Sequence, residues 1–367
     1  MGSDQESVTA PLLTDRTTIE TDWTCGMRRW WYKEEGGVGI VPVDTPAALR
    51  QGSEYHVDFA DIAEADSPEK AAIQLIEGLE SRIHSTTDGI LQEELTRRAG
   101  WIAANALFLE PQTRQDYLTL GVEFELVLER GDLWIAATPD RVLERKTDGA
   151  VIYRDYKGVG GWGVTKRWLD QWPYAVQQHT VLKALEEELG RKVAFGQVIG
   201  LSKGQEKYGR LQHPYVWAYW SDKEGWIPAG EGGGKKDLTP RPVWEYDGGI
   251  LEWVRKLGPE VAAGQFAFSP PIYLNERLLA DLVTSRTRRE KEVRIIRRRA
   301  QEDRTLRAKY FEPKHSACSP AIGSSCPYLL ACHNETINRD PLGSGLFVRR
   351  TPHHELEIIG GQDDTNT

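Results

Sequence analysis

An acid and a base stand two residues apart in the segment Ala150-Val-Ile-Tyr-Arg-Asp155-Tyr-Lys157. Strand side chains alternate between faces, so Asp155 and Lys157 are predicted to share one face at a strand's end. Phosphodiester hydrolysis needs such a pair, because the attacking water must lose a proton and the transition state gathers negative charge, which a metal cation and an ammonium group stabilise. The pair is a candidate site for metal-assisted phosphodiester hydrolysis.

A second carboxylate is available in the segment Thr138-Pro-Asp140-Arg-Val, at the end of the preceding predicted strand. An apparent antiparallel hairpin would place Asp140 beside Asp155, and two carboxylates supply the oxygen ligands that Mg²⁺ or Mn²⁺ prefers. An Asp-x-Lys triplet taken alone is more typical of a surface ion pair. The two segments together favour a metal site.

Four short segments, in the same order along the chain, resemble the motifs of the RecB-like branch of the PD-(D/E)XK nuclease superfamily. Gly52-Ser-Glu-Tyr-His56 resembles its Gly-x-x-x-His motif, and Thr138-Pro-Asp140-Arg resembles its Gly-x-x-Asp-Arg motif with threonine in place of the first glycine. Asp155-Tyr-Lys157 matches its Asp-Tyr-Lys motif. Gln177 falls where its helical Gln-x-x-x-Tyr motif begins, although Val181 replaces the tyrosine, and Gln177 is the fourth candidate catalytic residue.

The resemblance implies a divalent-metal-dependent DNA nuclease with an α/β, restriction-endonuclease-like core. His56, Asp140 and Asp155 would bind Mg²⁺ or Mn²⁺, with the carbonyl of Tyr156 as a further ligand. Lys157 would position the nucleophilic water or stabilise the transition state. The implied activity is that of an exonuclease on single-stranded DNA ends in recombination, repair or DNA processing, and a helicase or recombination partner is compatible with it.

Further charged residues near these motifs are candidates for supporting the site or contacting DNA. Glu123 and Glu125 share a face of the first predicted strand, and we expect Glu123 to point toward the site. Arg141 could pair with a carboxylate or touch a phosphate, and the sequence favours neither. Lys166 and Arg167 follow the proposed active strand and could contact the DNA backbone.

Tryptophans surround these two basic residues at positions 162, 168 and 172. Interleaved aromatic and basic side chains suit the binding of a single strand, because unpaired bases stack on aromatic rings. Trp168 and Trp172 lie four residues apart in a predicted helix, however, which favours packing in the core.

Four cysteines form a second group of candidate ligands. Cys25 stands near the start of the chain, whereas Cys318, Cys326 and Cys332 cluster near its end without a Cys-x-x-Cys pair. This spacing is compatible with zinc, an iron–sulphur cluster or unrelated buried thiols. The segments around Cys25 and Cys326 resemble those of an iron–sulphur subgroup of the same nucleases, which includes the CRISPR-adaptation exonucleases and the AddB-type nuclease domains. In that subgroup one N-terminal and three C-terminal cysteines hold a [4Fe-4S] cluster.

A cluster held in this way would join the two ends of the chain. By analogy with a disulfide, closing a loop of about 290 residues could restrict the unfolded chain by around 5 kcal/mol. The role of the cluster would then be structural. His315 and His333 flank the C-terminal cysteines and keep Zn²⁺ as the rival cofactor.

Composition and charge fit an ordinary globular protein of 367 residues with 40% hydrophobic and 28% charged residues. No apolar run approaches the roughly 18 residues that span a bilayer, and residues 1–19 lack the features of a secretion signal, so we expect a cytoplasmic protein without a membrane segment. The net charge is −9, yet residues 284–309 hold 11 Lys or Arg against 4 Asp or Glu. That stripe could face phosphates or form ion pairs on a helix surface.

The elements that must position these residues are predicted from periodicity. We expect disordered or flexible tails at 1–20 and 339–367, and one nuclease domain over 21–338 in which a central mixed β-sheet is flanked by helices. An exposed insertion is expected at about 222–249. The predicted helices are 71–84, 91–108, 168–189 with Gly190 as C-cap, 251–264 and 275–310. The predicted strands are 122–128, 133–138 and 150–156, an apparent antiparallel meander, followed by 194–201 and 214–220.

Two other functions remain open. A non-catalytic DNA-binding or recombination-accessory protein could keep the same fold and cluster, but the complete acid, acid and lysine set argues against it. A zinc-stabilised interaction module would explain the cysteines, but it would leave the motifs around His56 and Asp155 without a role.

Overall fold

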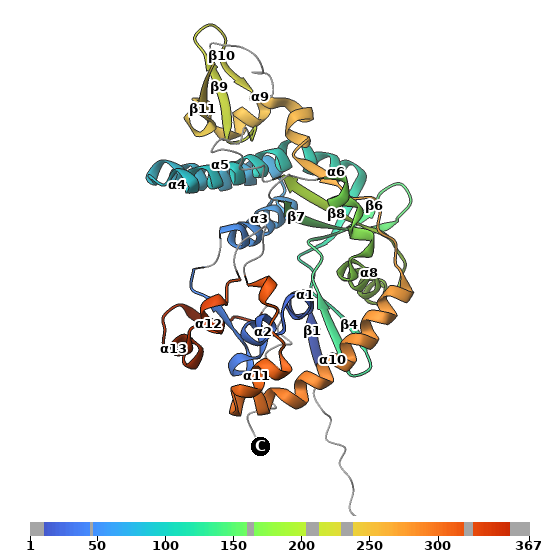
Figure 1. Cartoon of the computed structure of the whole chain (residues 1–367). Coiled ribbons are helices and arrows are strands. Elements are labelled where there is room, and N and C mark those ends of the chain that lie inside the picture. Colours follow the sequence, from blue (N-terminus) through green and yellow to red (C-terminus); the bar gives the residue numbers. More distant parts are fainter. Residues whose placement is uncertain are drawn as a thin grey trace, which may run out of the picture.

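Asp155 and Lys157 lie on the central strand of a mixed β-sheet in the computed structural model of the chain (Figure 1). The structure describes residues 11–44, 47–159, 165–202, 213–228, 238–318 and 326–352. Within them, no helix is long and apolar enough to cross a membrane. The chain is mixed α/β, as the sequence predicts.

The largest sheet has five strands in the order β12-β8-β7-β6-β3. Its central strand β7 (Val151–Val159) pairs in parallel with β8 (Val193–Ser202) and antiparallel with β6 (Arg141–Arg145). The edge strands are β3 (Tyr117–Val122) and β12 (Phe266–Phe268). Both pairing directions occur, so the prediction of a mixed central sheet is confirmed.

Alternation along β7 assigns its side chains to two hydrophobic cores. Val151 and Tyr153 pack with residues of α8 (Val176–Leu189), whereas Tyr156 packs with residues of α3 (Ala47–Glu64) on the opposite side. The sheet therefore lies between helices. Asp155 and Lys157 continue the row of Val151 and Tyr153, which places them on the α8 face at the end of the strand.

Most predicted helices appear with shifted bounds. The helix that precedes β8 is interrupted, because Pro173 has no N–H to donate; its pieces are α7 (Lys166–Asp170) and a 3₁₀ turn, Trp172–Tyr174, before α8. Gly190 caps α8 with φ of 63°, as predicted. Helix α3, which carries His56, lies where the sequence predicted no helix. The other helices are α2 (Gly26–Arg29), α4 (Pro68–Ser85), α5 (Gly89–Ala104), α6 (Glu110–Asp116), α9 (Gly249–Ala263), α10 (Glu276–Glu302), α11 (Thr305–Tyr310), α12 (Leu329–His333) and α13 (Glu335–Arg339).

The prediction of a disordered tail over residues 1–20 is wrong for residues 12–20. Strand β1 (Leu12–Asp15) pairs in parallel with β5 (Leu133–Ala137), which forms an antiparallel pair with β4 (Leu126–Arg130). Helix α1 (Arg16–Thr24) follows, and the Asp15 side chain caps it by accepting a hydrogen bond from the Thr18 N–H at 2.6 Å. This small sheet buries the apolar side chains of Leu12 and Ile19.

Two other expected irregular segments also contain strands. Within the predicted insertion, β10 (Gly225–Pro228) and β11 (Thr239–Pro242) pair with β9 (Trp217–Ser221). Trp226 of β10 packs against residues of α9, and burial of its apolar ring favours this arrangement. The middle of that insertion, residues 229–237, lies outside the described residues. Near the C-terminus, β13 (Phe347–Arg349) pairs with β2 (Ile40–Pro42), so a flexible tail from 339 is wrong up to that strand.

Buried ion pairs fix the N-terminal segment against α10, where the structure turns part of the basic stripe inward. Asp22, near the end of α1, accepts hydrogen bonds from two arginines of α10. Arg29 pairs with one acid of the N-terminal segment and one of α10. Breaking such a pair leaves an uncompensated buried charge, which typically costs about 3–5 kcal/mol. The pairs and their N–O distances are Asp22–Arg286 at 3.0 Å, Asp22–Arg289 at 3.0 Å, Arg29–Glu34 at 3.0 Å and Arg29–Glu290 at 2.6 Å.

Candidate functional site

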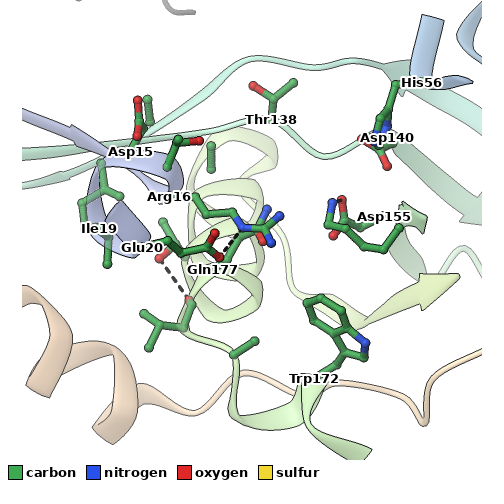
Figure 2. A pocket seen from close by; sticks show the side chains of 18 of the residues that line it. Asp15, Arg16, Ile19, Glu20, His56, Thr138, Asp140, Asp155, Trp172 and Gln177 are labelled. Atoms are coloured by element: carbon green, nitrogen blue, oxygen red, sulfur yellow. Dashed lines mark hydrogen bonds and ion pairs between the residues drawn. The ribbon is translucent and has the colours of Figure 1, made fainter. Parts of the chain in front are cut away.

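A pocket of about 850 Å³ opens at the end of β7 (Figure 2). Its wall combines α1, α3, the segment between β5 and β6, the end of β7 and the start of α8. Six of the predicted site residues line it: His56, Glu123, Asp140, Asp155, Lys157 and Gln177. The chain therefore brings residues more than a hundred positions apart to one cavity.

His56 and two carboxylates meet at one side of this pocket. The Nδ1 atom of His56 lies 3.0 Å from Asp140 Oδ1 and 3.9 Å from Glu123 Oε1, and the three ligand atoms lie within 4.8 Å of one another. The buried Nδ1 atom makes no well-aligned hydrogen bond within the described residues. A nitrogen that faces two oxygens in this way suits a shared cation, and the donor set fits Mg²⁺ or Mn²⁺.

Asp140, just before β6, lies near Asp155 on the neighbouring strand β7, but the hairpin that joins them is not the predicted one. Asp140 precedes β6, whereas the strand predicted to end beside it pairs with β4 in the smaller sheet. The Tyr156 N–H donates a hydrogen bond to Asp140 Oδ2, and Lys157 Nζ contacts Asp155 Oδ1. The Tyr156 ring packs on Phe59 at 5.0 Å, so only its backbone faces this site, and its carbonyl as a metal ligand stays a prediction.

The carboxylates influence one another strongly. Burial, then the negative charge of Asp140, raises the pKa of Glu123 to about 7. Burial also raises the pKa of Asp155, because the opposing effect of Lys157 does not outweigh burial together with repulsion from Asp140. Burial acts upward on the pKa of Asp140 too, but the neighbouring His56 and Lys157 side chains outweigh it, and the net shift is downward. A divalent cation would relieve this crowding of negative charge.

Glu123 takes a more direct position than the sequence predicts. It sits between β3 and β4 rather than inside a strand, and its φ of +46° is the only positive value at a non-glycine among the described residues. Such a backbone conformation costs energy and persists where the surroundings impose it, often at functional sites. Its carboxylate joins those of the candidate ligands, so Glu123 belongs with them.

The two glutamines at the start of α8 differ in their contacts. Gln178 Nε2 donates to Asp155 Oδ2 at 3.2 Å, and its Oε1 accepts from the Tyr153 hydroxyl, so Gln178 holds the carboxylate from behind. Gln177 lines the pocket, and its buried Oε1 atom has no hydrogen-bond partner in the described part of the chain. The sequence therefore found the helix turn but missed Gln178.

For the metal-dependent phosphodiester hydrolysis that the sequence predicts, we expect Gln178→Met to lower kcat by about ten- to a hundredfold. This is the range found when a residue that orients a metal ligand is lost. Asp155 would lose its donor at 3.2 Å. Steady-state kinetics with Mn²⁺ would separate kcat from KM, and Gln177→Met is the matched variant on the neighbouring position. A larger loss of kcat in Gln177→Met would contradict this assignment.

The remaining predicted residues have other environments. Arg141 is buried and pairs with Glu110 and the Thr119 hydroxyl, so it meets a carboxylate rather than a phosphate. Lys166 and Arg167 are exposed on α7 and do not line the pocket. Trp172 is buried, with its ring 5.1 Å from that of Trp168, which confirms the core interpretation of these two. Trp162 lies outside the described residues.

Residues of α1 complete the pocket, although the sequence assigned no chemistry to this segment. Arg16 extends from α1 toward Asp155, with Glu20 next to it (Figure 2). Arg16 Nε donates to Glu20 Oε1 at 2.6 Å. The signal that could have found this helix is the capping aspartate at position 15, followed by apolar Ile19.

The four cysteines line a second cavity of about 280 Å³. Trp31 Nε1 donates to Cys332 Sγ at 3.2 Å, and the Lys314 N–H donates to Cys25 Sγ at 3.4 Å. Burial raises the pKa of Cys332 to about 11 and raises that of Cys326, and the neighbouring cysteines add to both shifts. N–H donors aimed at sulphur, together with a cavity between four sulphurs, fit a cluster of several atoms better than one small ion.

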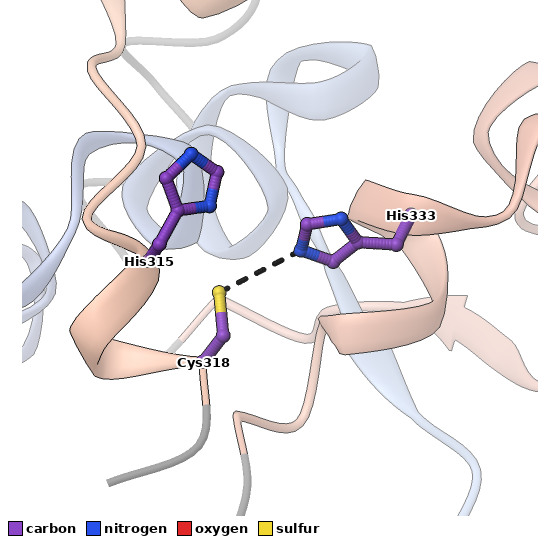
Figure 3. Close-up of side chains that lie close together, drawn as sticks. All are labelled: His315, Cys318 and His333. Atoms are coloured by element: carbon purple, nitrogen blue, oxygen red, sulfur yellow. Dashed lines mark hydrogen bonds between the residues drawn. The ribbon is translucent and has the colours of Figure 1, made fainter.

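Two histidines offer a different ligand set at the edge of the same cavity. His315, Cys318 and His333 place one ligand atom each within 4.8 Å of one another (Figure 3). Cys318 Sγ lies 3.7 Å from His333 Nε2. This spacing suits the ligands of a single Zn²⁺ ion, so the zinc alternative keeps a geometric basis.

No protein-family model matches the chain, and no curated protein matches it.

Proposed function

We propose that this protein is a divalent-metal-dependent DNA nuclease of the RecB-like PD-(D/E)XK kind, in which the mixed sheet around β7 is a restriction-endonuclease-like core. The observation that carries the proposal is the convergence of His56, Glu123, Asp140, Asp155 and Lys157 in one pocket. Hydrolysis of a phosphodiester bond needs a cation, a proton acceptor and a positive group near the reacting phosphate, and this set supplies the last two.

His56, Glu123 and Asp140 would hold Mg²⁺ or Mn²⁺, with Asp155 beside them. A divalent cation bound there supplies Lewis acidity and positive charge for a phosphate. Lys157, in contact with Asp155, would hold the attacking water and stabilise the charge that develops on the phosphate oxygens. By its resemblance to the iron–sulphur subgroup, the protein would act as an exonuclease on single-stranded ends in recombination, repair or processing.

The second cavity would hold a [4Fe-4S] cluster on Cys25, Cys318, Cys326 and Cys332. All four cysteines are free thiols that line that cavity. A zinc-stabilised interaction module is the second candidate function, and the group of His315, Cys318 and His333 favours it. A non-catalytic DNA-binding protein is the third, and the complete set of acids with Lys157 argues against it.

Labelled oligonucleotides would test the proposal. The anaerobically purified protein should degrade 5′- or 3′-labelled single strands in Mg²⁺ or Mn²⁺ and not in EDTA, and the labels would report the polarity. Asp140→Asn should abolish the degradation, whereas Asp148→Asn, on an exposed turn, should not. Metal-independent cleavage, or equal activity of both variants, would remove the proposed site.

A further inference from the structure

Two aromatic side chains line the active-site pocket and yet remain open to solvent. Trp23 at the end of α1 is 50% exposed, and Tyr174 in the turn before α8 is 77% exposed. Single exposed aromatics are ordinary on a protein surface. Two of them in the wall of one catalytic pocket offer faces on which planar groups can stack.

Trp23 is held firmly in its exposed position. The guanidinium of Arg286 lies over its ring, 5.4 Å from the centroid. Arg286 is itself buried and bonded to Asp22 at 3.0 Å, one residue before Trp23. The exposed part of the indole is therefore backed by a fixed charge, and binding a planar group there would cost little ordering of the side chain.

Tyr174 is likewise presented by a fixed turn. Its neighbour Trp172 is buried, and the backbone N–H of Tyr174 donates to the Gln171 carbonyl at 3.1 Å. The preceding carbonyl of Pro173 meets His179 Nε2 at 2.9 Å. The His179 Nδ1 accepts from the Asn275 N–H at 3.2 Å, so Nε2 is the nitrogen that carries the proton and donates to Pro173.

Arg16 lies in the same pocket, beside the candidate catalytic residues. It faces Asp155 from α1 (Figure 2). Its partner Glu20 is the more exposed of the two, with 54% of the side chain accessible against 32% for Arg16. The guanidinium can therefore exchange this partner for a phosphate, whose geometry it matches with two parallel hydrogen bonds.

We propose that Trp23, Tyr174 and Arg16 form a subsite that holds single-stranded DNA, with unpaired bases stacked on the two rings and a phosphate on the guanidinium. The inference rests on the proposed nuclease function and assigns the residues that bind the bases and a phosphate of its single-stranded substrate. A duplex cannot use such a subsite, because its base faces are covered by their neighbours. A pocket of about 850 Å³ also receives a flexible strand more readily than a rigid helix.

Fluorescence anisotropy with a short labelled single strand would test this subsite, with a duplex of the same sequence alongside. The measurement uses the full chain in EDTA and, on a Lys157→Met background, in Mn²⁺. We expect Trp23→Ala and Tyr174→Ala each to raise the Kd for the single strand about tenfold, and the double variant to raise it about a hundredfold. The phenylalanine variants should keep most of the affinity, and Arg16→Met should lower the dependence of log Kd on log salt by about 0.7.

Tyr273→Ala is the matched control, because Tyr273 is 66% exposed but lies outside the pocket. An unchanged Kd in the double variant, no binding of the single strand, or equal losses for the duplex would overturn the subsite. If the protein bound single-stranded RNA more tightly than DNA, with the same losses in the variants, RNA and not DNA would be the ligand of the subsite. If the wild type did not cleave DNA but the variants lost binding as expected, the nuclease proposal would be refuted and the subsite would stand. If the wild type cleaved DNA but the variants bound the single strand normally, the subsite would be refuted and the nuclease proposal would stand.

Discussion

Replacing Lys157 with methionine is expected to lower metal-dependent DNA cleavage by about a hundred- to a thousandfold, the loss typical when one group that stabilises transition-state charge is removed. Lys157 is the basic side chain in contact with Asp155, and its stem is mostly covered, with 18% of the side chain exposed. Methionine keeps the length and the apolar stem, so the change removes mainly the charge. Single-turnover cleavage of a labelled single strand in saturating Mn²⁺ would measure the effect.

The affinity for Mn²⁺ separates a catalytic role from a structural one. The change removes a positive charge that contacts Asp155, so the variant should bind Mn²⁺ at least as tightly as the wild type, as measured by calorimetry. Its melting temperature should stay close to that of the wild type. Lys183→Met, which removes an exposed ion pair with Glu276, is the control for charge loss. Cleavage within threefold of the wild type would show that Lys157 has no part in the reaction.

Cys332→Ser is expected to abolish cofactor binding and to destabilise the protein by up to about 5 kcal/mol, the loop-closure estimate for a tie between distant parts of a chain. Cys332 faces the cavity between the chain ends and accepts a hydrogen bond from the buried Trp31. Serine has the same shape but is a poor ligand for iron. Iron and acid-labile sulphide per chain, in anaerobically purified protein, would show the loss, and thermal unfolding would show the destabilisation.

His333→Ala distinguishes the two cofactors. If four cysteines hold an iron–sulphur cluster, this variant should keep its iron and sulphide, because His333 is then only a neighbour of Cys318. If His315, Cys318 and His333 hold zinc, the variant should lose the metal and Cys332→Ser should keep it. Stoichiometric zinc without sulphide in the wild type would contradict the cluster.

Local patterns in the sequence were sufficient to predict the central strand of the site. The alternation from Val151 to Lys157 correctly placed Asp155 and Lys157 on one face, because a strand's period of two needs no knowledge of its partners. The helix before β8 was found as well. Gln177 lines the pocket, as predicted, but the contact of Gln178 with Asp155 was not predicted, because neighbouring positions on a helix point about 100° apart and the sequence does not show which of them faces the strand.

Features that depend on distant partners were missed. Strand β1 pairs with β5, more than a hundred residues away, and a stretch of four residues has no periodicity by which to recognise it. The small sheet of β9, β10 and β11 was hidden for the same reason, since its glycines and prolines are typical of loops. The position of Glu123 depends on a turn with positive φ, which the sequence gives no reason to expect at a glutamate.

Helix α1 begins at Arg16 in the active-site pocket and is capped at its other end by Cys25, which lines the cysteine cavity. Nine helical residues span about 13 Å, so one short rod joins the two centres. On the proposals above, a newly made chain that has not yet received its inorganic cofactor would hold the Cys25 end of this rod through the ion pairs of Asp22 with α10, without the additional tie of the cluster. Oxidative damage to the cluster would therefore loosen one end of a helix whose other end carries Arg16 into the pocket.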